Sequence, residues 1–303
     1  MALVTPSLIK ALFAGFVKLF QDAQSEAPSH WQKIATEVPS TTKSNTYGWL
    51  GKFPKFREWI GDRVFNDMKA HGYSITNKDW EASVAVERTD IEDDEIGIYA
   101  PIFQEAGRAS KAQPDELVFG ALKNGISVAC FDGQFFFDTD HPVYANADGT
   151  GAVTTVSNSD VDLTTRPDNP VWYLMCTNRA IKPIIFQNRK KPVLTSMTAL
   201  TDEVVFVSNK FRFGADSRNN VGYGFWQMAY ASNQPLDKAN FAKAKAALES
   251  FKADGGQPLG IEATLLVVPP LLESAGRKLV VKDENGGNEW AGSVELLKSP
   301  WLA

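Results

Sequence analysis

The segment from residue 46 to residue 94 constrains the fold of this chain most. It is dense in aromatic and charged residues and is expected to have little core of its own. The aromatic residues that we consider as candidates for a subunit interface are Tyr47, Trp49, Phe53, Phe56, Trp59 and Trp80. Large apolar patches on a surface usually mark interfaces. The segment is therefore expected to be a long, hairpin-like excursion whose rings either contact a neighbouring subunit or pack back on the main body.

The second half of this segment predicts a β-strand. In the stretch "DWEASVAVER", apolar and polar side chains largely alternate: Trp80, Ala82, Val84 and Val86 share one face, and Glu81, Ser83 and Glu87 share the other. Successive side chains of a strand point to opposite faces of the sheet, so a period of two is typical of a strand with one buried face.

Two helices are predicted in the first half of the chain. Apolar residues recur at spacings of three and four between residues 9 and 20, which indicates an amphipathic helix, and Thr5-Pro6 supplies an N-cap and a first helical residue. The second helix spans residues 98–124. Pro114 should kink it or restart it, because a proline removes a backbone donor. Asp115 would then lie in the first turn of the restarted helix.

The second half of the chain is expected to mix strands with one clear helix. Short runs rich in branched and aromatic residues, such as "ISVACF", "VWYLMCTN", "PIIFQ", "EVVFVSNKFRFG" and "YGFWQMAYAS", predict strands between residues 126 and 232. Asp237 caps a predicted helix that ends at Gly255-Gly256. The apolar run "GIEATLLVVPP" predicts a strand buried on both faces.

The composition excludes several classes of protein. The chain has 303 residues and a net charge of −5, which argues against a nucleic-acid-binding protein with its usual basic face. No apolar window approaches the length of a membrane span. Cys130 and Cys176 lie in apolar surroundings and are expected to be buried free thiols.

The stretch "FFFDTDHPV" is the one candidate for a metal or catalytic site. Asp138, Asp140 and His141 offer carboxylate and imidazole ligands within four residues, which would suit a metal-dependent hydrolase. The alternative is a turn before a proline, in which aspartates accept hydrogen bonds from nearby backbone N–H groups. No second cluster supplies further ligands in an obvious motif, and no phosphate-loop, nucleophile-elbow or dinucleotide motif is present. The turn is the favoured interpretation.

Four blocks occur in a fixed order along the chain. They are "ATEVPSTTKSNTYGWLGKFPKFREWIGDR", "FFFDTDHPV", "FGADSRNNVGYGFWQMAYAS", and the pair "GGQPLGIEATLLVVPPLLESAGRKLV" and "NEWAGSVELLKSPWLA". Together they resemble the major head (capsid) subunit, gpT, of Mu-like phages and prophages, from about residue 9 to residue 303. The strand-rich block 171–232 departs from the order seen in other capsid subunits with a similar histidine-proline loop.

The resemblance implies an α+β chain with the Hong Kong 97-type capsid fold. That fold has an N-terminal arm, an E-loop that reaches a neighbour, a spine helix in a P-domain, and an A-domain. On this chain the implied divisions are 1–45 for the N-terminal arm with its amphipathic helix, 46–94 for the E-loop, 95–125 for the spine helix, 126–236 for a β-rich P/A-domain region, and 237–303 for the α/β remainder.

The resemblance also implies a function. The chain would be a major capsid protein that assembles into hexamers and pentamers of an icosahedral shell around double-stranded DNA, without sequence-specific DNA contacts. Implied partners are other copies of itself, a scaffolding protein or protease, a portal protein and a decoration protein. The implied location is the virion, with the host cytoplasm during assembly and no membrane. No catalytic residue, cofactor or metal is expected. The metal-dependent hydrolase is the alternative.

Overall fold

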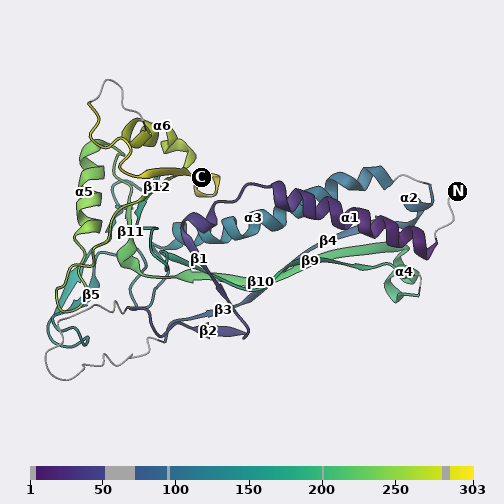
Figure 1. Ribbon diagram of the computed structural model, residues 1–303, viewed down its shortest axis with the longest axis horizontal. Helices are drawn as coiled ribbons and strands as arrows, with labels where there is room; N and C mark the ends of the chain where they lie inside the picture. The colour runs from purple at the N-terminus through teal and green to yellow at the C-terminus, as the bar shows by residue number, and fades with distance from the viewer. Residues whose placement is uncertain (1–4, 52–71, 94–95, 200, 282–286) are drawn as a thin grey trace.

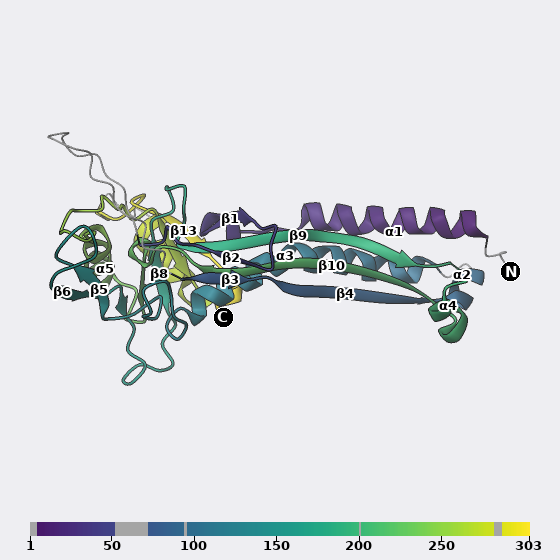
Figure 2. The ribbon, with the colours of Figure 1, turned by 90° about the horizontal axis from the view of Figure 1, so that it is seen from below.

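The computed structural model describes residues 5–51, 72–93, 96–199, 201–281 and 287–303. Two regions are evident in Figure 1. We call the first helix and the described residues of 35–39, 78–124 and 184–223 the arm. We call the described residues of 126–183 and 224–303 the head. The arm extends away from the head as a narrow layer of helices on strands, and the N-terminal end of the first helix lies at its far end (Figure 2).

Two parallel helices run along the arm. Helix α1 (Pro6–Glu26) begins as predicted: Thr5 caps it by accepting a hydrogen bond from the backbone N–H of Leu8, at 3.3 Å. It packs on α3 (Ala100–Asn124), with the rings of Phe16 and Phe103 stacked at 4.1 Å between centroids. Further along, Gly107 permits close approach, because a Cβ there would collide with the backbone carbonyl of Phe20.

The prediction that the second helix restarts at Pro114 is wrong. Helix α3 continues through Pro114, and Asp115 is a buried side chain in the middle of the helix instead of in a first turn. The carboxylate of Asp115 accepts hydrogen bonds from the backbone N–H groups of His30 (2.9 Å) and Trp31 (2.6 Å). This residue therefore holds the chain that leaves α1, and the packing of α1 along α3 favours one continuous helix despite the missing backbone donor.

The arm sheet has the strand order β1-β9-β10-β4. Its members are β1 (Ala35–Pro39), β9 (Ile184–Met197), β10 (Lys210–Tyr223) and β4 (Lys78–Glu87). Strands β9 and β10 form a long antiparallel hairpin, and β4 confirms the predicted strand by pairing antiparallel with β10. Phe213 of β10 contacts the rings of Phe16 and Phe103, so α1 and α3 cover one face of the sheet.

The head is built on a five-stranded sheet with the order β13-β12-β8-β11-β7. Its strands are β7 (Ser159–Asp160), β8 (Trp172–Met175), β11 (Ala229–Ser232), β12 (Leu265–Val268) and β13 (Glu295–Lys298). Every residue of the three central strands is buried, which confirms the strand predicted from the apolar run before residue 269. Helix α5 (Lys238–Glu249) confirms the predicted helix and its cap, Asp237, but it ends at Glu249 and not at the predicted Gly255-Gly256.

The remaining elements are short. They are the hairpins of β2 (Ser44–Thr46) with β3 (Ser74–Thr76) and of β5 (His141–Tyr144) with β6 (Val153–Val156), and the helical turns η1 (Trp31–Lys33), α2 (Arg88–Glu92), η2 (Ile96–Tyr99), α4 (Glu203–Ser208), η3 (Trp226–Met228), η4 (Pro270–Leu272), α6 (Glu273–Gly276), η5 (Arg277–Val281, a π-helical turn) and η6 (Pro300–Leu302). Within the described ranges, none of the helices has the length and apolar character to cross a bilayer.

Three predicted strands differ in the structure. The first half of "EVVFVSNKFRFG" is helix α4, because the chain must reverse between β9 and β10, and Asn209 ends that helix in a left-handed conformation (φ 54°). The stretch "ISVACF" forms turns at the end of α3, with one isolated bridge from Ala129 to Phe135. In "YGFWQMAYAS" the first residue ends β10 and the last four form β11, with the turn η3 between them. Short apolar runs do not by themselves distinguish strand from helix or turn.

Candidate functional site

Tyr47, the first residue of the predicted aromatic interface, is buried in its own subunit. Its side chain is 3% exposed, and its hydroxyl donates a hydrogen bond of 2.8 Å to Oε1 of the buried Gln187 on β9. Burial, with a smaller effect from Tyr73, raises the pKa of Tyr47 to about 12. The structure thus supports the alternative in which this ring packs back on the main body.

The other members of the aromatic set have different positions. Trp49 is half-buried and lies between Tyr47 and Phe225, with ring centroids 5.9 and 5.8 Å away. Trp80 is also half-buried, and its Nε1–H donates to the carbonyl of Asn219 at 3.2 Å. The remaining three predicted residues, Phe53, Phe56 and Trp59, lie outside the described residues. The interface role of this set stays a prediction.

The two aspartates of the "FFFDTDHPV" stretch take part in local loop contacts. Asp138 accepts hydrogen bonds from the backbone N–H groups of Phe135 (3.1 Å) and Thr139 (2.7 Å), as expected for the turn interpretation. Asp140 accepts a hydrogen bond from Nε2 of Gln134 at 3.3 Å. A hydrogen bond with Asp138 raises the pKa of Asp140.

His141 lies in a buried cluster that the sequence did not predict. Its ring is completely buried and stacks on the indole of Trp226, with centroids 4.0 Å apart and planes 8° apart. Nδ1 lies 2.7 Å from Oδ2 of Asp132, and Nε2 lies 3.2 Å from Oδ1 of Asn158. We call these four residues, with Cys130, the histidine cluster.

The predicted set of three metal ligands is not assembled. In the part of the chain that the structure describes, one group brings three potential ligand atoms within 4.8 Å of one another, and it consists of Cys130, Asp132 and His141. All three are already joined by hydrogen bonds, because Sγ of Cys130 donates to Oδ1 of Asp132 at 3.0 Å. Burial, and then the charge of Asp132, raises the pKa of the Cys130 thiol, so this cysteine is not an activated nucleophile.

One sequence signal could have pointed to Asp132. The dipeptide Asp132-Gly133 is a turn signal, and Gly133 has a positive φ of 91° in a tight reversal that pairs Ala129 with Phe135. This reversal returns the chain so that residue 132 faces residue 141. No spacing in the sequence indicates the contributions of Asn158 and Trp226, which come from other parts of the head.

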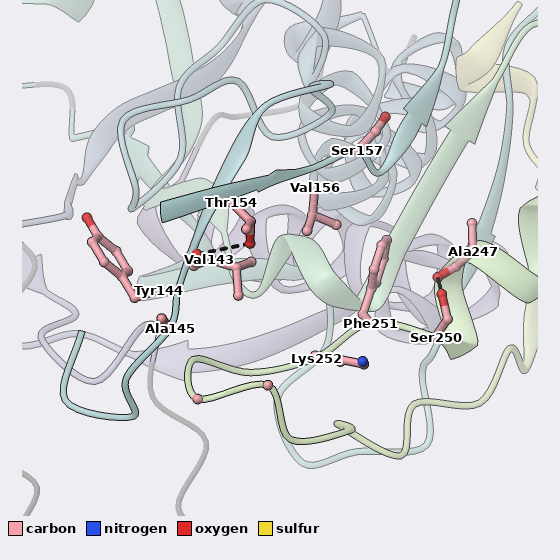
Figure 3. A pocket seen from close by; sticks show the side chains of 12 residues that line it. Val143, Tyr144, Ala145, Thr154, Val156, Ser157, Ala247, Ser250, Phe251 and Lys252 are labelled. Carbon is pink, nitrogen blue, oxygen red and sulfur yellow. Dashed lines mark hydrogen bonds between the residues drawn. The ribbon is translucent and has the colours of Figure 1, made fainter. Parts of the chain in front are cut away.

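A shallow pocket lies beside the hairpin that begins at His141. It has a volume of about 440 Å³ and lies between the β5–β6 hairpin and the end of α5 (Figure 3). Val143, Val156 and Phe251 contribute apolar side chains to it, and Lys252 is the one charged residue that lines it. Tyr144, Thr154, Ser157 and Ser250 add hydroxyl groups to this lining.

The far end of the arm presents large apolar side chains to solvent. Helix α4, at the turn of the β9–β10 hairpin (Figure 1), is anchored by the buried side chain of Val205. The next two residues point outward: Phe206 is 86% exposed and Val207 is 76% exposed. Met197, at the end of β9, is also exposed. We call Phe206, Val207 and Met197 the arm tip. The sequence analysis missed it, because this run was interpreted as a strand.

Comparison with solved structures identifies the class of protein. The chain is similar to the procapsid protein of bacteriophage JBD30, with a TM-score of 0.85 and 52% identity over 98% of this chain and 100% of that one. It is also similar to the JBD30 capsid, with a TM-score of 0.74 and 42% identity over all of both chains. The chain therefore has the α+β, Hong Kong 97-like fold of phage capsid proteins.

Comparison of sequences identifies the family. A model of the Mu-like prophage major head subunit gpT family matches residues 9–302. The major head subunit of the Mu-like prophage FluMu of Haemophilus influenzae is 51% identical over 93% of this chain and 92% of its own length. The major capsid protein of Escherichia phage Mu is 47% identical over 99% of this chain and 100% of its own. The chain belongs to the Mu-like major head subunit gpT family, and its function is that of a major capsid protein.

Proposed function

We propose that the subunit assembles into hexamers and pentamers of an icosahedral shell, and that contacts at the arm tip help to join the subunits. The observation that carries this proposal is the exposure of Phe206 and Val207 on helix α4, whose Val205 side chain is buried in the same subunit. Two adjacent large apolar side chains are unfavourable in contact with water, and their burial against a neighbouring subunit is favourable.

The aromatic segment supplies a second proposed contact. Trp49 and Trp80 are half-buried, so each retains a surface that a neighbouring subunit can cover. We propose the same role for Phe53, Phe56 and Trp59, on the strength of the sequence pattern. Tyr47 contributes indirectly, because its buried hydroxyl bond to Gln187 fixes the base of this segment on β9.

The test is assembly of a double variant, Trp49→Ser with Phe53→Ser, observed by negative-stain electron microscopy after expression with a scaffolding protein. We expect soluble subunits that form few or no shells. Tyr47→Phe is the matched control, since it removes one internal hydrogen bond and leaves the ring in place. Normal shells from the double variant would contradict the interface role.

Other partners follow from the same role. We propose a scaffolding protein or protease during assembly in the host cytoplasm, a portal protein, and a decoration protein. One similar structure is the JBD30 capsid decorated with minor capsid protein trimers, which supports the last of these. Double-stranded DNA would fill the shell without sequence-specific contacts, in keeping with the net charge of −5.

We propose that the subunit acts by assembly and not by catalysis. The comparisons give no support to the alternative of a metal-dependent hydrolase, and the hydrogen bonds of Asp138 and Asp140 are those of a loop. Metal analysis of the purified protein tests this point: a stoichiometric ion that requires these two aspartates and His141 would revive the hydrolase.

A further inference from the structure

Asn158 defines the protonation pattern of the histidine cluster, because its own orientation is determined by its neighbours. Its Nδ2 lies 2.8 Å from the carbonyl oxygen of Phe136, 3.2 Å from that of Trp226 and 3.3 Å from that of Ala229. Its Oδ1 lies 2.9 Å from the backbone N–H of Asp138. An amide nitrogen donates and an amide oxygen accepts. The reverse orientation would place an oxygen against three carbonyl oxygens, so the amide has one acceptable orientation.

The orientation of Asn158 requires a proton on Nε2 of His141. That nitrogen lies 3.2 Å from Oδ1 of Asn158, and an oxygen that only accepts must face a donor. The tautomer that keeps a lone pair on Nε2 is therefore excluded in this arrangement. What remains to be decided is whether Nδ1, on the other side of the ring, also carries a proton.

The carboxylate of Asp132 faces Nδ1 at 2.7 Å. Its other oxygen already accepts hydrogen bonds from Sγ of Cys130 (3.0 Å) and from the backbone N–H of Gln134 (3.1 Å), an environment that favours the ionised form. An ionised carboxylate can only accept, so Nδ1 must donate.

We infer that His141 is an imidazolium with both ring nitrogens protonated, and that it forms a buried ion pair with Asp132 that locks the turn at residues 130–141 to the rest of the head. The lock joins three segments: the turn at 130–141, the strand connection at Asn158, and η3 at Trp226. The stacked indole adds a favourable contact with the cation. Loss of the proton on Nδ1 would break the hydrogen bond to the ionised Asp132, and loss of the proton on Nε2 would break the hydrogen bond to Asn158.

The groups that titrate around the ring are few. Asp132 and Cys130 contact one another and the Asp132 carboxylate contacts the ring, while Asp140 is exposed on the same loop and is influenced by the charge of His141. The segments that pack from the other sides contribute the neutral side chains of Asn158 and Trp226. The charge balance of the cluster therefore depends on one carboxylate and one imidazole. This inference concerns the head alone and is independent of how the arm assembles.

The experiment is ¹⁵N NMR of the histidine rings in the full chain, by solid-state methods where the chain is assembled. The chain has three histidines, so His30→Gln with His71→Gln leaves the signals of His141 alone. At neutral pH, with a chelator present, we expect both ring nitrogens of His141 to show directly bonded protons. One protonated and one bare nitrogen would overturn the inference. So would a stoichiometric metal ion that the chelator removes with a change in these signals.

Asp132→Asn provides a matched variant. Its amide can donate to Nδ1 while its oxygen still accepts from Gln134, so the ring can remain in place as the neutral tautomer with its proton on Nε2. We expect one ring nitrogen to lose its proton signal in this variant at neutral pH. Retention of both proton signals would show that Asp132 does not hold the second proton and would overturn the ion pair. The wild-type measurement decides the inference if this variant fails to fold.

Discussion

The head and the arm bury their apolar surface in different ways. The three central strands of the head sheet are buried along their whole length, and they belong to the larger of the two core clusters. The arm has a long sheet with helices on one face and a small cluster of buried residues around Phe103 and Phe213. Beyond that cluster, at the arm tip, Phe206 and Val207 are left to solvent. The central sheet of the head is enclosed within one chain, whereas the tip of the arm is not covered by its own chain.

This difference suggests that the two regions depend on neighbouring subunits to different degrees. A self-contained head can keep its shape while its position in a shell changes, since its core does not depend on neighbours. An arm with a thin core and an apolar end is stabilised further when another subunit covers it. The predictions that follow would each weaken or refine this contrast.

The largest effect is expected in the head core. Trp172 is fully buried in β8, and its Nε1–H donates to the carbonyl of Gln234 at 2.8 Å. Trp172→Ala should lower the free energy of unfolding by about 3–5 kcal/mol, because it leaves a large cavity and an unpaired carbonyl. Denaturant unfolding of the subunit measures this. A loss below about 1 kcal/mol would contradict a head that depends on its own core.

A smaller effect is expected where α1 crosses α3. Gly107→Val should destabilise the subunit by roughly 1–3 kcal/mol, because the new side chain collides with the Phe20 backbone and forces the helices apart. The first 26 residues should become more accessible to limited proteolysis. Gly120→Ala is the matched control: it lies on the same helix with open space around it and should stabilise the helix by about 0.5–1 kcal/mol. Equal unfolding free energies and equal rates of proteolysis for Gly107→Val and Gly120→Ala would contradict the close contact of Gly107 with Phe20.

Acid should weaken the head through Asp132. The pKa of this group is lower in the folded chain than in the unfolded one. Its ionised form therefore stabilises the fold above its unfolded pKa, and this contribution is lost in acid as the pH falls through its lowered folded pKa. The stability advantage of the wild type over Asp132→Asn should therefore shrink as the pH falls through this acid range. A difference that stays constant into that range would contradict the ionised carboxylate.

The smallest effect on the free subunit is expected at the arm tip. Phe206→Ser with Val207→Ser should change the unfolding free energy by less than about 0.5 kcal/mol, because both side chains are exposed. The same variant should assemble poorly, as measured by the yield of shells in sedimentation. Phe206→Leu keeps an apolar side chain and should assemble. Full assembly of the double serine variant would remove the arm tip from the set of subunit contacts.

The sequence predicted elements with a strong local pattern. The predictions of helices α1 and α5 and of strands β4 and β12 were correct. Capping residues mark where a helix begins, and hydrophobic periodicity indicates which face of an element is buried. The break at Pro114 was wrong, because contacts with α1, far away in the sequence, stabilise a continuous α3. Helix α4 was missed for a similar reason: the need to reverse the chain outweighs the strand preference of its valines.

The candidate site was predicted only in part. The turn at Asp138 was expected from the spacing of aspartate and proline, and the structure agrees. The real partners of His141 lie nine and seventeen residues away, or across the head at Trp226, and such contacts depend on the tertiary fold. The burial of Tyr47 also depends on a distant residue, Gln187 of β9.

The most direct test of the contrast between head and arm is hydrogen exchange of backbone amides, compared between free subunits and assembled shells. We expect the amides of β8, β11 and β12 to be equally protected in both states. We expect the amides of α4 and of the adjoining end of β9 to exchange rapidly in the free subunit and to become protected in the shell. Equal protection of the arm tip in the two states would contradict an arm that is completed by its neighbours.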